Sequence, residues 1–272
     1  MKDFAGKVAV VTGAASGMGK AFIMDFARRG MHVVLADIEA GPLEAARQEA
    51  EALGAKAIAQ VCDVSKREAV QALADKAFDA FGAVHVLCNN AGVSIEGQMH
   101  EHLHKEWEWV LGVNLWGVIH GIEAFLPRMV AQNKVSQKPG GHVVNTASIA
   151  GLHAAGGTGI YNTSKFAVVG LSETMWRDLR DTGIGVSVLC PLGVHTGIFE
   201  SARNQPGDIG RAITDINPRT AGSGTWLTPE QVSGMVMDAI EQERLYILTH
   251  PETEGILEKR FARIRNGYPK TT

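Results

Sequence analysis

An apolar run that leads directly into a cluster of glycines constrains the fold of this chain more than any other feature. Residues 8–12 are apolar enough for a strand that is buried on both faces, as in a parallel sheet. Gly13, Gly17 and Gly19 follow, and a helical pattern continues over residues 20–29. A buried strand, a glycine turn and a helix form the first half of a βαβ unit. The chain is therefore expected to begin a parallel α/β sheet.

Strand and helix patterns alternate along the rest of the chain without a break in composition. Such alternation predicts right-handed crossovers and a seven-stranded, doubly wound parallel sheet with helices on both faces. A length of 272 residues suits one large domain, so residues 1–272 are expected to form a single unit. The candidate strands are 7–12, 32–36, 56–61, 84–88, 141–147, 184–190 and 245–248. The candidate helices are 17–29, 40–53, 66–81, 101–131, 160–181 and 228–242.

Charge and cysteine content limit the partners and the compartment. A net charge of −3 argues against a broad surface for nucleic acid or an anionic membrane. We see no apolar run near the roughly 20 residues that span a bilayer, and the first strand begins too early for a signal peptide. Cys62, Cys88 and Cys190 lie in or beside apolar strands, which indicates buried reduced thiols rather than disulfides or a metal cluster. A cytoplasmic location follows by default.

The glycine turn also has the composition of a phosphate site. Glycines let the backbone approach a diphosphate, and the following helix offers free N–H groups. The spacing is G-x3-G-x-G rather than the common G-x-G-x-x-G, and glycines here can also be purely structural. Asp37 ends the next strand, 24 residues after Gly13. An acidic side chain there would accept hydrogen bonds from an adenosine ribose.

Tyr161 and Lys165 lie four residues apart on one predicted helix, and therefore on one helical face. At ~4 Å and an effective dielectric near 20, the attraction between phenolate and ammonium is about 4 kcal/mol. That would lower the pKa of Tyr161 by up to roughly three units and make it a general acid or base near neutral pH. The spacing alone fits a surface tyrosine with a solvated lysine better, and the glycine turn upstream is what favours the catalytic interpretation.

Together these residues resemble the short-chain dehydrogenase/reductase family over roughly residues 5–200. The resemblance implies a Rossmann fold and an intact catalytic set. The matching positions are Thr12–Gly19 for Thr-Gly-x3-Gly-x-Gly, Asn89–Gly92 for Asn-Asn-Ala-Gly, Asn114, Ser148, Tyr161 and Lys165. The segment Pro191–Thr196 departs from the family's Pro-Gly-x-Val-x-Thr, because Leu192 replaces the glycine.

The resemblance implies hydride transfer between a nicotinamide cofactor and a secondary alcohol or ketone. Tyr161 would exchange a proton with the substrate oxygen, and Ser148 would hydrogen-bond that oxygen. Lys165 would hold the cofactor ribose, and Asn114 would position a water that links Lys165 to solvent. The cofactor contacts are expected at Gly13, Ser16, Gly17, Met18, Gly19, Asp37, Ile38, Asp63, Val64, Asn90, Ala91, Gly92, Tyr161, Lys165, Pro191, Val194 and Thr196.

The expected cofactor is NAD rather than NADP. Asp37 would stand where the 2′-phosphate of NADP must go, and like charges repel. The neighbouring positions offer no compensating arginine, since Ala14, Ala15 and Ser16 fill the turn and Ile38 follows the aspartate. A non-enzymatic alternative is a cofactor-binding sensor or scaffold that keeps the fold.

The substrate is expected to be bulky and hydrophobic or aromatic. Residues 192–227 form a long irregular loop that would cover the substrate, and Gly193 with the small residues 154–159 would leave a roomy, apolar pocket. Residues 245–261 resemble the end of bacterial short-chain dehydrogenases that oxidise benzylic carbinols of aryl ethers. A steroid or terpenoid alcohol is the nearest competing class, and a sugar alcohol fits less well.

Several histidines and tryptophans allow other interpretations. His100, His102 and His104 contain a His-Glu-x-x-His pattern typical of zinc peptidases, although a polar helix start explains it better, and we expect no metal. Core packing is favoured over an aromatic platform for the tryptophans Trp107, Trp109 and Trp116. Of the remaining histidines, a structural role is expected for His142, a pocket or loop position for His153, and a place beside the nicotinamide for His195.

The family resemblance also implies a homo-oligomer, most simply a tetramer. The helices at 117–131 and 160–181 would form its interface, because they hold more apolar residues than a solvated helix needs. The alternative is that all of these residues face the sheet. The residues in question are Gly121, Ala124, Phe125, Phe166, Val169 and Met175.

Overall fold

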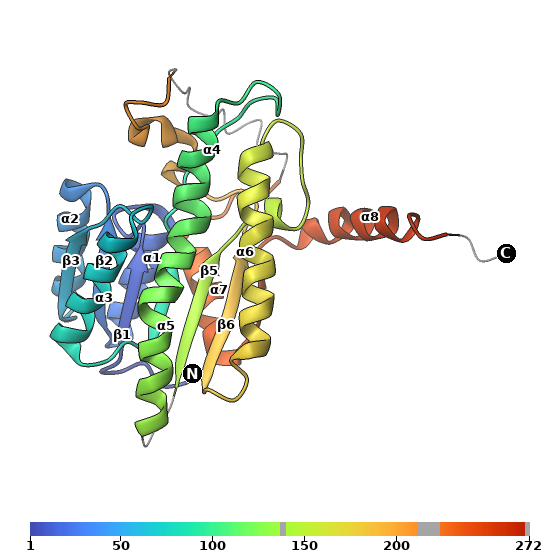
Figure 1. The fold of residues 1–272 in the computed structure, drawn as a ribbon. Coiled ribbons are helices and arrows are strands. Elements are labelled where there is room, and N and C mark those ends of the chain that lie inside the picture. Colours follow the sequence, from blue (N-terminus) through green and yellow to red (C-terminus); the bar gives the residue numbers. More distant parts are fainter. Residues whose placement is uncertain (137–139, 211–223, 270–272) are drawn as a thin grey trace.

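Seven parallel strands form one sheet in the order β3-β2-β1-β4-β5-β6-β7 in the computed structural model (Figure 1). The structure describes residues 1–136, 140–210 and 224–269. The predicted doubly wound Rossmann-type sheet is confirmed, and every predicted strand is present. The strands are β1 (Val8–Thr12), β2 (His32–Asp37), β3 (Ala57–Val61), β4 (Val86–Asn89), β5 (Gly141–Thr146), β6 (Ile184–Cys190) and β7 (Tyr246–Leu248).

The apolar run in β1 is continuous because both faces of the sheet are covered. Successive side chains of a strand point to opposite faces. Ala9 and Val11 join the core beneath α1, α2 and α7, whereas Val8 and Val10 join the core beneath α3, α5 and α6. The helices of the first face are α1 (Gly17–Arg28), α2 (Ala40–Ala52) and α7 (Pro229–Gln242), and those of the second are α3 (Arg67–Phe81), α5 (Gly117–Val135) and α6 (Gly159–Asp178).

The long helix predicted at 101–131 is interrupted by a wider turn. It begins as α4 (His104–Leu111), passes through a π-helical segment at Gly112–Trp116, and continues as α5. Such π segments insert one extra residue and often occur at functional sites. Here the segment contains Asn114, whose side chain is completely buried.

Sequence patterns missed the C-terminal helix α8 (Glu254–Arg265) and a short 3-10 segment at Gly197–Asn204. The continuous stretch His104–Val135 is long and apolar enough to cross a membrane by length and composition, contrary to our expectation. Half of its most apolar window is buried against the rest of the protein, as in the core helix of a globular fold. The three cysteines are free and buried, as predicted.

Most of the apolar positions assigned to an oligomer interface belong to the protein core instead. Six residues suggested an oligomer interface in the sequence. Of these six, only Phe166 has a partly exposed side chain. The reason is close helix-to-sheet packing, which is tightest at Gly121 on α5. A Cβ atom there would lie 2.1 Å from Oδ1 of Asn89 at the end of β4. Only glycine lets α5 approach the sheet this closely.

Gly121→Ala should therefore destabilise the protein by about 1–3 kcal/mol, since the added methyl group overpacks a buried polar contact. Gly234→Ala on α7 is the matched control, because an added Cβ there meets nothing within 4 Å. The control should be neutral or stabilising by up to about 1 kcal/mol from helix propensity. Urea unfolding of both variants checks this, and equal effects would contradict the packing argument.

Candidate active site

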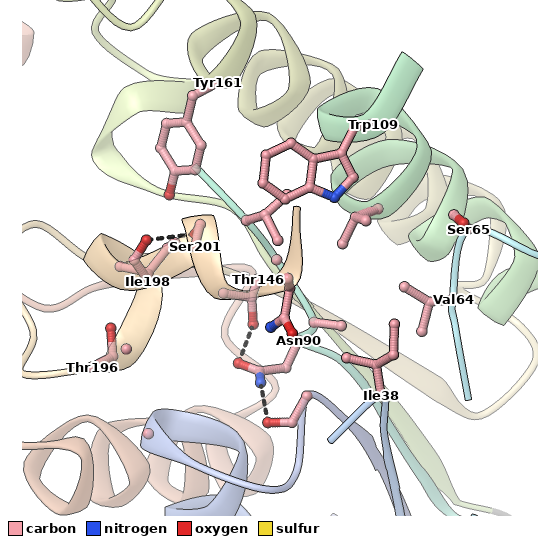
Figure 2. A pocket seen from close by; sticks show the side chains of 18 of the residues that line it. Ile38, Val64, Ser65, Asn90, Trp109, Thr146, Tyr161, Thr196, Ile198 and Ser201 are labelled. Atoms are coloured by element: carbon pink, nitrogen blue, oxygen red, sulfur yellow. Dashed lines mark hydrogen bonds between the residues drawn. The ribbon is translucent and has the colours of Figure 1, made fainter. Parts of the chain in front are cut away.

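A cavity of about 850 Å³ opens at the carboxyl ends of the strands, beside the crossing from β1 to β4. The order of the strands reverses its direction of growth at that point, which is where open α/β sheets bind ligands. Figure 2 shows the cavity between Ile38 and Tyr161. Asp37 and Ser148 also line it.

The glycine turn forms one wall of this cavity and leaves no room for side chains. Gly13 has a φ of +66°, and a Cβ atom there would lie 2.9 Å from the Cα atom of Ala91. A Cβ atom at Gly19 would lie 2.0 Å from the carbonyl oxygen of Gly13. Ser16 makes no side-chain capping bond to α1, so its side chain does not occupy the first N–H groups of the helix. The turn thus presents backbone donors to the cavity.

The Asn89–Gly92 motif is tied to this turn through Thr12 and Asn90. The Thr12 hydroxyl accepts hydrogen bonds from the N–H groups of Asn90 (2.9 Å) and Ala91 (3.1 Å). The Asn90 side chain donates to the Thr12 carbonyl at 3.0 Å. It also accepts from the Thr146 hydroxyl at 3.2 Å (Figure 2). Three neighbouring strands are therefore joined at the floor of the cavity.

Asp37, which follows the glycine turn along the cavity wall, is held in place by two backbone donors. Its carboxylate accepts from the N–H groups of Ala15 at 2.9 Å and Glu39 at 3.1 Å. Ile38 beside it is 49% exposed and lines the cavity. This position suits a carboxylate that receives a ligand hydroxyl group.

Ser148, Tyr161 and Lys165 converge at the deep end of the cavity. The Ser148 side chain hydrogen-bonds Tyr161 and lies 3.4 Å from the Pro191 carbonyl oxygen. The Lys165 ammonium group lies 5.4 Å from the centre of the Tyr161 ring and donates to the Thr146 carbonyl at 2.9 Å. Lys165 is only 2% exposed, so a cation is held inside the protein.

Burial dominates the pKa values of this pair, and our expectation of a lowered tyrosine pKa is wrong for the cofactor-free protein. Desolvation raises the pKa of Tyr161 to about 12, and the hydrogen bond from Ser148 opposes this rise. Desolvation also lowers the pKa of Lys165 to about 8. The sequence argument counted the attraction between charges but not the cost of removing them from water.

Asn114 lies behind the cavity wall rather than in it. Its Oδ1 atom accepts from the N–H of Val93 at 2.8 Å, and its Nδ2 atom donates to the Val93 carbonyl at 2.9 Å and to the Ser164 hydroxyl at 3.1 Å. A Cβ atom at Gly92 would lie 3.4 Å from Asn114 Oδ1 and 3.6 Å from Lys165 Nζ. The π segment thus brings Asn114 close to the buried lysine.

A short stretch of the long loop forms a roof over the cavity, which we define as residues 197–209. The Ser201 hydroxyl accepts from the N–H of Ser94 at 3.0 Å in a buried contact. Two residues further along the chain, Arg203 pairs with Glu39 at 2.6 Å. Near the C-terminal end of the roof, Asp208 pairs with Lys105 at 3.2 Å. We expected residues 192–227 to cover the substrate, and residues of this segment line the cavity, although residues 211–223 lie outside the described part of the chain. No arginine was expected to line the same cavity as Asp37.

All of the predicted site residues line the cavity except Gly19 and Asn114, which lie directly behind it. Leu192 lines it too, and its N–H bonds Nδ1 of His250 at 3.2 Å, so the departure from the family pattern does not displace the segment from the site. Sequence reasoning missed further lining residues, which lack a local motif: Lys66, Val93, Lys105, Glu108, Trp109, Thr146, Ile198, Phe199, Ser201, Arg203, Asp208 and Ile209.

The cavity is not widened by the small residues that we expected to line it. Gly193 is packed against Trp226, whose ring would lie 3.2 Å from an added Cβ atom, and residues 154–159 do not line the cavity. The ring of His195 is tilted against the same Trp226, with the ring centres 5.2 Å apart, and His195 lines a smaller neighbouring cavity. His153 lines neither of these two cavities. Charged side chains are also more frequent in the lining than we expected.

The histidines and tryptophans that allowed other interpretations in the sequence make contacts within the helices and the sheet. His102 pairs with Glu106 at 2.8 Å with both side chains buried, and His104 lies 3.5 Å from Glu108. Among the described residues, no group of three His, Cys, Asp or Glu side chains could hold a metal. Trp109 is buried as predicted, whereas Trp116 is exposed and its ring is tilted against that of His120. His142 is buried in the sheet, 2.8 Å from Ser187 Oγ, so its role is structural.

Comparison with known proteins places this fold and cavity in one family. The family model described as short chain dehydrogenase matches residues 7–207, well over half of the chain. The chain therefore belongs to the short-chain dehydrogenase/reductase family, a family of oxidoreductases.

Relatives match along nearly the whole chain. A Cα-dehydrogenase of Sphingobium sp. (strain NBRC 103272 / SYK-6) is 36% identical, over 97% of this chain and 87% of the relative. A 3beta-hydroxysteroid dehydrogenase 2 of Eggerthella lenta is 35% identical, over 84% of this chain and 85% of the relative. A crystal structure of a short-chain dehydrogenase/reductase from Burkholderia phymatum in complex with NAD has a TM-score of 0.90 and 42% identity, covering 100% of this chain and 99% of that one.

The raised pKa of Tyr161 can be measured by ultraviolet titration of the cofactor-free protein. Subtracting the titration of Tyr161→Phe from that of the wild type isolates one phenol, which should ionise with a midpoint near pH 12. Rapid pH-jump absorbance avoids alkaline unfolding. The ordinary pKa of a tyrosine is about 10. A difference signal with a midpoint below that value would show that the attraction of Lys165 for the phenolate outweighs the cost of burying the phenolate.

Proposed function

We propose that this chain is an NAD-dependent dehydrogenase that interconverts a secondary alcohol and a ketone, and that it acts on bulky hydrophobic or aromatic substrates. The observation that carries the proposal is the convergence of Tyr161, Ser148 and Lys165 in the cavity that also contains the glycine turn and Asp37. Alcohol oxidation needs a group that exchanges the hydroxyl proton beside the hydride acceptor.

The residues of the cavity fit a dinucleotide. The turn from Gly13 to Gly19 would bind the diphosphate through backbone N–H groups at the start of α1. Asp37 would bind the adenosine ribose, and Lys165 would bind the other ribose. When bound, the nicotinamide supplies the hydride acceptor or donor.

The remaining chemistry falls to this chain's own side chains. In the ketone-reducing direction the Tyr161 phenol donates its proton to the substrate oxygen, and Ser148 donates a hydrogen bond to the same oxygen as charge develops on it. Oxidation requires the phenolate. Burial makes that state costly. The positive charge of Lys165, 5.4 Å from the centre of the Tyr161 ring, would offset part of this cost. Asn114, bonded to the Val93 backbone, fixes the wall behind Lys165.

The apolar side of the cavity supports a bulky substrate. Val93, Trp109 and Ile209 belong to one apolar cluster and also line the cavity, and Figure 2 shows Trp109 and Tyr161 bordering the same space. Lys105 and Asp208 pair with each other, so these two charges need no partner from the substrate. The similarity to a 3beta-hydroxysteroid dehydrogenase makes a steroid alcohol the second candidate.

An NAD-reduction screen across benzylic, steroidal, terpenoid and polyol alcohols tests this assignment. Bulky aryl carbinols should turn over and polyols should not, because the substrate end of the cavity buries apolar groups. Tyr161→Phe should lower kcat by at least about 100-fold, since it removes the proton-exchanging group. NADH fluorescence titration should give an unchanged Kd in that variant.

Three results would each overturn a separate part of the proposal. Undiminished turnover by Tyr161→Phe would remove Tyr161 from the chemistry. Tight NADH binding without turnover of any alcohol or ketone would favour a cofactor sensor. Good turnover of polyols but not of aryl carbinols would reject the substrate class alone.

NAD should be preferred over NADP because the carboxylate of Asp37 would face the 2′-phosphate. Asp37→Asn removes this charge. It should lower the ratio of kcat/KM for NAD to kcat/KM for NADP by at least about tenfold, or about 1.4 kcal/mol. Asp79→Asn, at an exposed position of α3, is the matched control and should leave the ratio unchanged. A wild-type enzyme that prefers NADP would contradict the assignment.

A further inference from the structure

The C-terminal helix α8 lies almost entirely outside the body of its own chain. None of its residues is buried, and Figure 1 shows it projecting beyond α6. Arg260 contacts the body by lying 5.3 Å above the Phe166 ring of α6. An isolated helix of 12 residues is marginal in water even with good helix formers. This helix therefore needs contacts that its own protomer does not supply.

One face of α8 is apolar. Leu257, Phe261 and Ile264 follow each other at spacings of four and three residues, which places them on one side of the helix. Phe261 is 54% exposed and Ile264 is 48% exposed. Tyr268, just beyond the helix, is also exposed. A stripe of this kind is a surface that requires a partner.

Charge favours a second copy of this chain as that partner. α8 has two glutamates and four basic residues, a balance of +2, whereas the whole chain carries −3, so the rest of the chain carries −5. A basic arm on an acidic body is attracted to another body of the same kind. An anionic membrane is the other surface that suits a basic amphipathic helix, but it would repel the acidic body.

We propose that α8 packs its Leu257, Phe261 and Ile264 face against a second copy of the chain. In a closed symmetric dimer each copy gives one arm and receives one, so both apolar stripes are covered. This surface differs from the α5 and α6 positions that the sequence suggested, most of which face the sheet of their own protomer. The inference does not depend on the proposed reaction.

Photocrosslinking of the full chain tests where Phe261 lies. A photoreactive phenylalanine analogue is placed at position 261, and chains grown in ¹⁴N and ¹⁵N media are mixed, exchanged and irradiated. Crosslinked peptide pairs that combine both isotopes are expected, since the stripe contacts another copy. Pairs of a single isotope only, or no crosslink, would overturn the proposal.

Substitution of the stripe gives an independent measurement. The double variant Phe261→Asp, Ile264→Asp should raise the protein concentration at which the oligomer dissociates by at least about tenfold, because two apolar side chains lose a buried site. Ala262→Asp is the matched control, since it adds the same group to the opposite face of α8. Equal dissociation of the two proteins in light scattering and mass photometry would reject the stripe as an interface.

Further measurements distinguish the loss of an interface from misfolding and from membrane binding. Thermal unfolding and NADH binding of the double variant should match those of Ala262→Asp, because the substituted positions are exposed in the protomer. Sedimentation with phosphatidylserine vesicles should leave the wild type in the supernatant. Vesicle binding that the double variant loses would assign the stripe to a lipid surface instead.

Discussion

A chain of hydrogen bonds through Thr12, Asn90 and Thr146 holds the cavity together, because it joins the carboxyl ends of three neighbouring strands. Asn90 accepts from the Thr146 hydroxyl, and the Thr12 hydroxyl accepts from the backbone of the Asn90 segment. The Thr146 carbonyl then accepts from Lys165. The buried ammonium group is therefore positioned relative to the glycine turn by specific side-chain bonds as well as by the sheet.

Desolvation makes the resting, protonated state of Tyr161 harder to leave. A phenol with a pKa of about 12 and an amine with a pKa of about 8 are, at neutral pH, a neutral tyrosine and a charged lysine. The site at rest is thus prepared to give a proton from Tyr161 rather than to take one. A second interaction must lower the tyrosine pKa before the reverse direction becomes easy, and the charge of Lys165 is close enough to contribute.

The sheet and the motifs were predictable from sequence because their signals are local. Periodicity identifies β1 and α1 within 20 residues, and parallel strands necessarily bring Gly13, Asp37 and Ser148 to one edge. The pKa of Tyr161 was mispredicted because burial depends on the whole fold. The contact between Glu39 and Arg203, 164 residues apart, has no sequence signature. Helix α8 was missed because no apolar face of it contributes to the core.

The contacts that hold the roof over the cavity differ in strength. Ser201 is held to Ser94 by a buried hydrogen bond, whose loss would leave a polar group without water. Arg203 and Asp208 are held by exposed ion pairs to Glu39 and Lys105, which contribute only about 0–1 kcal/mol each and weaken with salt. The roof therefore depends more on the buried contact at Ser94 than on its two ion pairs, and added salt weakens the ion pairs but leaves that contact in place.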